Sequence, residues 1–286
     1  MGILKFRLPF IALVPVILVM FVMSCKQKKI ILKSPPHYNF SEVFEHKLDL
    51  KLKEISGLAW DTKKDEFIAH YDEAGKLFFL DRENKAIKSE YVFGGKGDYE
   101  DIALVGDVPY ILKSDGVITK FIKDTANKAY GEEVGKLTIA GPNDFEAMYY
   151  DSTRKALVVI CKNCEIDDKT SVSAFAFYLD SIGFDNKPLY RIDAKAIEAM
   201  SPKKTSKFQP SGAAIHPVLN KLFIISSASN LLVIADLNGK PESVYTLSKK
   251  LFPQPEGIAF KSKGDMYISN EGVNARGNIL RFIYKP

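Results

Sequence analysis

Glu54-Ile-Ser-Gly-Leu-Ala-Trp60 is the first of five related phrases in the sequence. The other four are Asp98-Tyr-Glu-Asp-Ile-Ala-Leu104, Asp144-Phe-Glu-Ala-Met-Tyr-Tyr150, Gln209-Pro-Ser-Gly-Ala-Ala-Ile215 and Gln254-Pro-Glu-Gly-Ile-Ala-Phe260. Each signature starts with an acid or amide, has Glu or Ser in its third place and ends in three mostly apolar residues. Three of the four intervals between signatures are 44 to 46 residues and the other is 65. A period of this length is typical of a propeller or solenoid, so we expect each repeat to be one supersecondary unit.

Short apolar segments separated by Gly, Asn and Asp turns follow each signature, which predicts strands. In the first four repeats we expect strands at 57–61, 66–70, 76–80 and 87–93; 102–105, 109–113, 117–122 and 136–139; 147–151, 156–161, 172–179 and 189–192; and 213–216, 221–226, 231–237 and 244–247. The fifth repeat has only three, at 258–260, 266–269 and 279–283. The alternating segment 46–52 would supply the fourth and protect both edges. The sequence therefore predicts an all-β, five-bladed β-propeller over residues 42–286, closed by an N-terminal strand.

The N-terminal residues have the pattern of an export signal. Lys5 and Arg7 precede an apolar run at 8–23, and Val22-Met-Ser-Cys25 is similar to a bacterial lipobox. We expect a signal peptide at 1–24, a lipidated Cys25 and a tether at 25–41. An uncleaved membrane helix is the alternative, although the run is shorter than the ~20 residues that a bilayer requires.

The positive net charge belongs to this N-terminal part. Residues 1–41 carry six of the 40 Lys and Arg residues and no acid, which leaves 34 basic against 35 acidic residues after them. The propeller therefore has no overall basic charge with which to hold nucleic acid. We expect a lipid-anchored protein of the bacterial cell envelope that faces the periplasm.

The remaining cysteines, Cys161 and Cys164, form a single Cys-x-x-Cys motif. In an exported protein we expect a local disulfide, because the compartment is oxidising. Two free thiols are the next interpretation. A thioredoxin-type centre lacks its strand–helix context, and a zinc site lacks a second pair of ligands.

The long interval contains an insertion at about 193–207, where a segment with helix-favouring composition precedes Lys203, Lys204 and Lys207. It joins one blade to the next, so it should emerge where the signatures begin. It is either a lid or a solvated connection.

The third signature position supplies candidate metal ligands. The inner strand of each blade lines the channel and the second strand is antiparallel to it, so signature starts and second-strand ends share one face. The starts carry Ser56, Glu100, Glu146, Ser211 and Glu256, and the ends carry Asp72, Asp115, Asn163, Ser227 and Asn270. Converging carboxylates need a proton or a cation, and calcium accepts six to eight oxygen ligands. We therefore expect a calcium site formed from Glu100, Glu146, Glu256, Asn270 and Asp115; the alternative is that these acids cap strands or pair with lysines.

The signatures, the leader and Met266-Tyr-Ile-Ser-Asn-Glu-Gly272 together resemble the SdiA-regulated, or YjiK-like, family of bacterial exported proteins. The resemblance implies a five-bladed, NHL/YWTD-like propeller with bound calcium, and it implies no firm enzymatic activity. Ser56 and Ser211, which replace Glu in two signatures, are doubtful ligands.

Three functions are compatible with these patterns. The first is a membrane-anchored calcium propeller that binds a small molecule, a glycan or a protein. The second is a calcium-dependent hydrolase of a lactone or phosphate ester. The third is a purely structural metal. The sequence contains no G-x-S-x-G or H-E-x-x-H motif, and we expect His70 to be a hydrogen-bonding residue and His216 a structural one.

Overall fold

The computed structural model describes residues 1–2, 33–202, 207–272 and 275–286. The chain divides into two compact units, Met1–Ile31 and Leu32–Pro286. Among the described residues, no helix has the length and apolar character needed to cross a membrane. The predicted signal peptide and Cys25 fall within residues 3–32 and therefore lie outside the described part of the chain.

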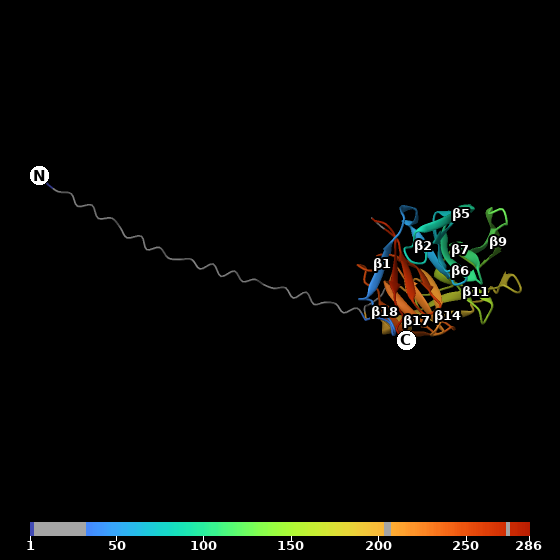
Figure 1. The fold of residues 1–286 in the computed structure, drawn as a ribbon. Helices are drawn as coiled ribbons and strands as arrows, with labels where there is room; N and C mark the ends of the chain where they lie inside the picture. Colours follow the sequence, from blue (N-terminus) through green and yellow to red (C-terminus); the bar gives the residue numbers. More distant parts are fainter. Residues whose placement is uncertain (3–32, 203–206, 273–274) are drawn as a thin grey trace. The chain divides into compact units, whose positions relative to one another are not determined.

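Five antiparallel sheets make up the second unit (Figure 1). The first two blades consist of β2 (Ile55–Asp61), β3 (Glu66–Tyr71), β4 (Ala74–Leu80) and β5 (Ile87–Lys96), then β6 (Tyr99–Val105), β7 (Val108–Lys113), β8 (Val117–Lys123) and β9 (Ala129–Lys136). The third consists of β10 (Asn143–Asp151), β11 (Ala156–Cys164), β12 (Ser171–Tyr178), β13 (Gly183–Phe184) and β14 (Tyr190–Asp193). The fourth consists of β15 (Gly212–His216), β16 (Lys221–Ser226), β17 (Leu231–Ala235) and β18 (Pro241–Thr246).

The fifth blade joins the two ends of the propeller unit. It pairs β1 (Val43–Lys47) with β21 (Asn278–Phe282), followed by β20 (Met266–Asn270) and β19 (Pro255–Phe260). In Figure 1 the blue β1 lies against the red C-terminal part of the chain. The predicted five-bladed propeller closed by an N-terminal strand is confirmed.

The position predicted for the closing strand, 46–52, is wrong. The alternation of apolar residues there arises from a turn, because the Asp49 carboxylate accepts the Lys51 N–H at 2.9 Å and caps the 3-10 helix η1 (Leu50–Leu52). Leu52 is buried and Leu50 is exposed. The strand itself lies earlier, at β1, where Val43 pairs with Phe282.

The outer strand of the second blade also differs from its prediction at 136–139, since β9 ends at Lys136. Its sequence lacks an apolar alternation because it includes Gly131 and Gly135. A Cβ at Gly135 would lie 2.4 Å from the Phe177 ring, so a glycine lets the third blade pack closely here. The local sequence pattern gives no sign of this contact between blades, so it could not predict where β9 lies.

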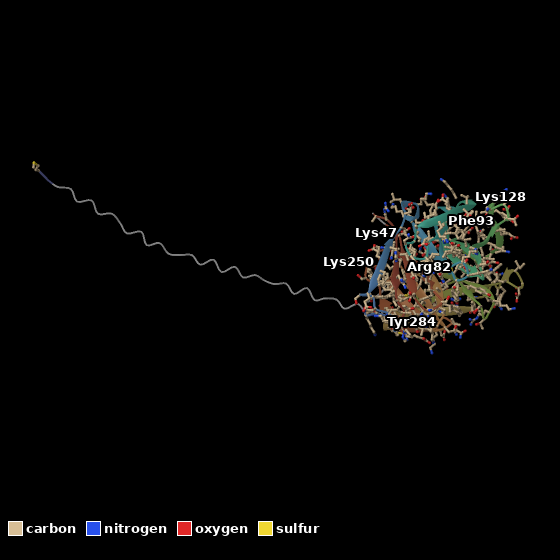
Figure 2. All side chains as sticks on the ribbon, in the orientation of Figure 1. Lys47, Arg82, Phe93, Lys128, Lys250 and Tyr284 are labelled. Carbon is tan, nitrogen blue, oxygen red and sulfur yellow. A yellow bond between two sulfur atoms is a disulfide. The ribbon has the colours of Figure 1, made fainter. Side chains whose placement is uncertain are left out.

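Residues 33–41, predicted as the end of a tether, already belong to the propeller unit. Phe40 is buried against Phe252 and Phe282. The Tyr38 hydroxyl donates to the Gly264 carbonyl at 2.6 Å. Tyr284, labelled in Figure 2, packs beside Tyr38 with ring centroids 5.7 Å apart. The predicted start of the propeller at residue 42 is therefore too late, because two aromatic residues before it join the core.

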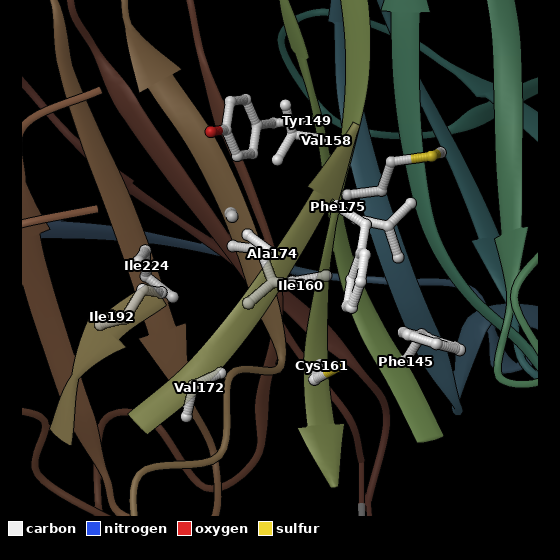
Figure 3. Packing of buried hydrophobic residues seen from close by; sticks show 14 of the residues in the cluster. Phe145, Tyr149, Val158, Ile160, Cys161, Val172, Ala174, Phe175, Ile192 and Ile224 are labelled. Atoms are coloured by element: carbon white, nitrogen blue, oxygen red, sulfur yellow. The ribbon is translucent and has the colours of Figure 1, made fainter. Parts of the chain in front are cut away.

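Apolar side chains between neighbouring blades form the core. Figure 3 shows part of the largest cluster, in which Ile192 of the third blade lies near Ile224 of the fourth. These side chains are at most 1% exposed. Each fully buried side chain of this size contributes about 1.5 to 3 kcal/mol, so the blades are held together mainly by their faces.

The fourth signature position lies where the inner strands approach one another closely. A Cβ at Gly212 would be 2.3 Å from the Glu256 carbonyl, and a Cβ at Gly257 would be 2.7 Å from the Ser56 carbonyl. In the second blade this position is Asp101, whose buried carboxylate accepts the Met148 N–H at 2.8 Å. Burial raises the pKa of Asp101 well above its ordinary value. The inner strands therefore lie too close together for side chains at Gly212 and Gly257, and the second blade has a buried carboxyl at this position.

Candidate functional site

β-Bulges place the third signature residue at one end of the channel. The pairing of β6 with β7 shifts between Tyr99 and Asp101, and the pairing of β10 with β11 shifts between Phe145 and Ala147. Glu100 and Glu146 are the residues left out of register. An extra residue in one strand turns its side chain away from the regular alternation. We call this end the acidic mouth, defined by Asp98, Glu100, Asp144, Glu146 and Glu256.

Three of these carboxylates form a compact group. Glu100, Asp144 and Glu146 each offer an oxygen, and these atoms all lie within 4.8 Å of one another. The Lys162 ammonium, from β11, forms an ion pair with Glu146 and lies 3.7 Å from Asp144 Oδ2. The Glu146 side chain is only 12% exposed and that of Lys162 is 32% exposed. The structure therefore supplies one basic side chain to a group of three acids.

The electrostatics of the acidic mouth favour protons or cations. Burial, together with the neighbouring Asp98, raises the pKa of Glu100 to about 9. Burial also raises the pKa of Asp144. Across the mouth, burial and the charge of Glu271 raise the pKa of Glu256 to about 8. Since like charges in a poorly solvated site disfavour ionisation, a cation bound by Glu100 and Asp144 would lower the pKa values of these two acids.

The five predicted ligands do not come together as one group in the described residues. Glu100 and Glu146 do, while Glu256 stands apart from their group. The buried Asn270 amide donates to Asn278 Oδ1 at 2.9 Å. Asp115 pairs with Lys136 at 2.9 Å, as the alternative interpretation expects for a surface acid.

Sequence reasoning missed two residues of this group, Asp144 and Lys162. Asp144 opens the third signature, so the acid in its first place was an available signal. Lys162 lies inside the Cys-x-x-Cys motif, and only the pairing of Asp144 with Asn163 brings this end of β11 to the acidic mouth.

The two signature serines connect neighbouring inner strands. Ser56 Oγ donates to the Glu100 carbonyl at 2.6 Å, and Ser211 Oγ donates to the Pro255 carbonyl at 2.7 Å. Each bond joins one blade to the next. These contacts give the serines a structural role, consistent with the doubt about them as ligands.

A second acidic pocket of about 300 Å³ lies where the first and fifth blades meet. Its lining includes Glu54, Asp72, Glu73, Gln254 and Glu271. Gln254 Nε2 donates to Glu271 Oε2 at 2.6 Å. Burial is the main cause of the raised pKa values of Asp72 and Glu271. This pocket extends the negative character of the acidic mouth toward the edge of the propeller.

Both candidate histidines are buried. His70 Nε2 accepts the Gly57 N–H at 3.2 Å, and burial lowers the pKa of His70 to about 4. His216 Nδ1 accepts the Val218 N–H at 3.1 Å, and burial lowers its pKa to about 4 as well. Both are thus neutral hydrogen-bonding residues of the scaffold at neutral pH.

The disulfide and the insertion lie beside the acidic mouth. Cys161 and Cys164 are joined by a disulfide, the first of the interpretations drawn from their spacing. The insertion contains the helix α1 (Ala194–Met200). Lys203 and Lys204 lie outside the described residues, whereas Lys207 Nζ donates to Asn163 Oδ1 at 2.6 Å.

The opposite end of the channel is apolar. A cavity of about 200 Å³ is lined only by the last three residues of the five signatures. We call this end the apolar mouth, defined by the final residues Trp60, Leu104, Tyr150, Ile215 and Phe260. Lys261 Nζ lies 4.3 Å from the centre of the Trp60 ring.

The donor chemistry of the compact group fits a hard divalent cation. Carboxylate oxygens are the ligands that calcium prefers, and its tolerant geometry accepts both one- and two-oxygen carboxylates. Burial raises the pKa values of Glu100 and Asp144, so the charged forms of these acids are poorly solvated. Lys162 already supplies one positive charge, so a cation must compete with it.

Comparisons with known proteins are consistent with this fold. The family model described as SdiA-regulated matches residues 35–274. A search of curated proteins gives no match to the chain.

Among solved structures, the Myxococcus xanthus glutaminyl cyclase is similar with a TM-score of 0.57 and 13% identity, covering 85% of this chain and 96% of that chain. A luciferin-regenerating enzyme is similar with a TM-score of 0.52 and 10% identity, covering 84% and 95%. A Bacteroides thetaiotaomicron protein of unknown function has a TM-score of 0.53 and 13% identity, covering 80% and 60%. At these identities the similarity indicates the fold alone.

Proposed function

The chain belongs to the SdiA-regulated family, and from this premise we propose that it is a calcium-binding propeller that presents its acidic mouth to a ligand or protein partner. The single observation that carries the proposal is the compact group of Glu100, Asp144 and Glu146. Three carboxylates converge there on a rigid scaffold, at the end of a channel. Such a site is organised for a cation before the cation arrives.

These three carboxylates would hold the ion, and calcium would supply a positive centre that attracts oxygen atoms of a ligand. The inner strands fix the direction of each carboxylate through their bulges. Ser56 keeps the strand that bears Glu100 attached to the first blade. The chain thus contributes placement and negative charge, and the bound ligand would be a small molecule, a glycan or a protein surface.

The proposal includes attachment to a membrane. Cys25, the expected site of lipidation, precedes the first residues that pack on the propeller by a short interval. Two or more acyl chains give stable anchoring where one gives only reversible binding. We place the protein in the bacterial cell envelope, facing the periplasm. Labelling with a radioactive fatty acid, compared between the natural protein and Cys25→Ala, tests this part, and equal labelling contradicts it.

Thermal melts with calcium and with chelator test the metal site. A ligand at 100 times its dissociation constant adds about 2.7 kcal/mol to the stability, so calcium should raise the melting temperature by several degrees. Glu146→Gln should abolish most of this rise. Asp115→Asn is the matched control, because its carboxylate pairs with Lys136 outside the group. A calcium effect that Glu146→Gln leaves intact, or no effect at all, contradicts the proposal.

A second candidate function is calcium-dependent hydrolysis of a lactone or phosphate ester. The observation in its favour is Glu256, whose raised pKa of about 8 leaves it protonated at neutral pH. A protonated carboxyl near a metal is suited to act as a general acid. Hydrolysis of lactone and phosphate-ester substrates with calcium, compared between the natural protein and Glu256→Gln, tests this function. Activity that is absent, or unchanged in the variant, removes it.

A further inference from the structure

Lys162 lies against the carboxylates of the acidic mouth that would hold a cation. Its ammonium forms an ion pair with Glu146 and lies 3.7 Å from Asp144 Oδ2. It also lies near enough to Glu100 and Glu256 for its charge to lower the pKa values of both. We propose that Lys162 is a built-in competitor cation, which must withdraw from the carboxylates before calcium binds. This inference rests on the proposed function and adds how the site is regulated.

The end of β11 that carries Lys162 is fixed on both sides of this residue. The disulfide joins Cys161 to Cys164, and both cysteines are buried in the third blade. Asn163, the other residue between them, accepts the Lys207 ammonium at 2.6 Å. The backbone of Lys162 therefore keeps its place, and only the side chain is left to move.

The lysine side chain has a route out of the site. It is 32% exposed, whereas the Glu146 side chain that it contacts is 12% exposed. A long, flexible chain of four methylene groups lets an ammonium move while its backbone stays fixed. A cation entering the mouth would displace the ammonium toward solvent without opening the propeller.

Competition by a tethered charge sets the selectivity of the site. An attached ammonium has a high effective concentration at the carboxylates, in the millimolar range or above for a short tether. A monovalent ion gains no electrostatic advantage over the ammonium that it replaces. A divalent ion gains about twice the Coulomb attraction at equal distance. Lys162 would thus exclude sodium and potassium and admit calcium.

Isothermal titration of calcium chloride into the full-length protein in detergent tests the inference. Lys162→Met removes the competing charge and should bind calcium about tenfold more tightly, which is about 1.4 kcal/mol. Sodium chloride should weaken calcium binding more in Lys162→Met than in the natural protein. Lys162→Arg restores the charge and should return the affinity toward the natural value. Lys136→Met is the matched control, because it removes a lysine from the acid Asp115 outside the group.

The outcomes separate this inference from the proposed function. If the natural protein binds calcium and a folded Lys162→Met binds it equally or more weakly, Lys162 is not a competitor, although the calcium site stands. If neither protein binds calcium, both the site and the competition fail. Circular dichroism and a melt in chelator establish that the variant is folded. If Lys162→Met does not fold, Lys162→Gln takes its place, and the same comparison of affinities decides.

Discussion

The two mouths of the channel are built from the same five signatures and have opposite chemistry. The first three positions form the acidic mouth, where Glu100 and Glu256 have pKa values raised to about 9 and about 8. The last three positions form the apolar mouth, whose lining contains no charged residue. Gathered carboxylates oppose folding unless they are compensated, while buried apolar surface favours it. The apolar end therefore stabilises the ring, while the acidic end is the one at which we propose that a cation binds.

The residues between the mouths should give the largest effect, because both ends depend on them. Gly212→Val places a Cβ 2.3 Å from the Glu256 carbonyl, so the fourth and fifth blades must separate. We expect a loss of about 3 to 4 kcal/mol and a weaker response to calcium, measured by urea denaturation with and without the ion. Gly95→Ala is the control, since a Cβ there meets nothing within 4 Å. Equal stabilities of the two variants would show that the inner strands have room to spread.

Truncating a side chain of the apolar mouth should lower the stability of the protein without changing its response to calcium. Leu58 is 2% exposed and lines the cavity. Leu58→Ala should lower the free energy of unfolding by about 2 to 3 kcal/mol, as cavity-forming changes do. The calcium-dependent rise in melting temperature should remain the same as in the natural protein. A smaller calcium response in this variant would mean that the two mouths are coupled through the inner strands.

Much of the fold was predictable because the repeat carries both the period and the strand pattern. The apolar ends of the signatures and the Gly and Asp turns located almost every strand within a few residues. The two errors in strand position have different causes, a turn formed by a local cap and an outer strand without apolar alternation. The closing strand precedes Leu48 because Asp49 caps a turn, and β9 is polar because it is an outer strand.

The candidate site was predictable only in part. The third signature position identified Glu100 and Glu146, since inner strands converge on the channel. The other members of the site depend on the pairing register of the strands. Asp144 joins the group through its place at the start of β10, and Lys162 joins it through antiparallel pairing within the third blade. Asp144 was marked by its first place in the third signature, whereas nothing in the local sequence distinguishes Lys162 from other lysines.

Alkaline pH should lower the stability that the acidic mouth contributes and leave the contribution of the apolar mouth unchanged. The folded pKa of Glu100 is about 9 against an ordinary value of 4.5, so the folded state favours the protonated form. Its contribution to stability is complete below pH 4.5 and is lost as the pH rises toward about 9. Glu100→Gln mimics the protonated form. In chelator its free energy of unfolding should therefore match that of the natural protein at pH 4 and exceed it at pH 8.5.

Urea denaturation at the two pH values measures this difference. Leu58→Ala is the reference from the apolar mouth, because its loss of stability should be equal at both pH values. If Glu100→Gln also shows a difference that is independent of pH, the Glu100 carboxyl is already ionised in the folded protein. The acidic mouth would then be better compensated than its burial indicates.

The smallest effect concerns Lys261, whose ammonium contacts Trp60 at the rim of the apolar mouth. Trp60 is the only tryptophan in the chain, so its fluorescence reports on this mouth alone. Lys261→Gln removes a cation 4.3 Å from the ring and should lower stability by about 0.5 to 1 kcal/mol while shifting the emission. Lys263→Gln, two residues along the same turn, is the control. Calcium should leave the emission of the natural protein unchanged, because the proposed calcium site is at the acidic mouth, at the other end of the channel. An emission shift on adding calcium would instead mean that a cation binds at the apolar mouth or that the two mouths are coupled. Either result would contradict the proposal that only the acidic mouth responds to calcium.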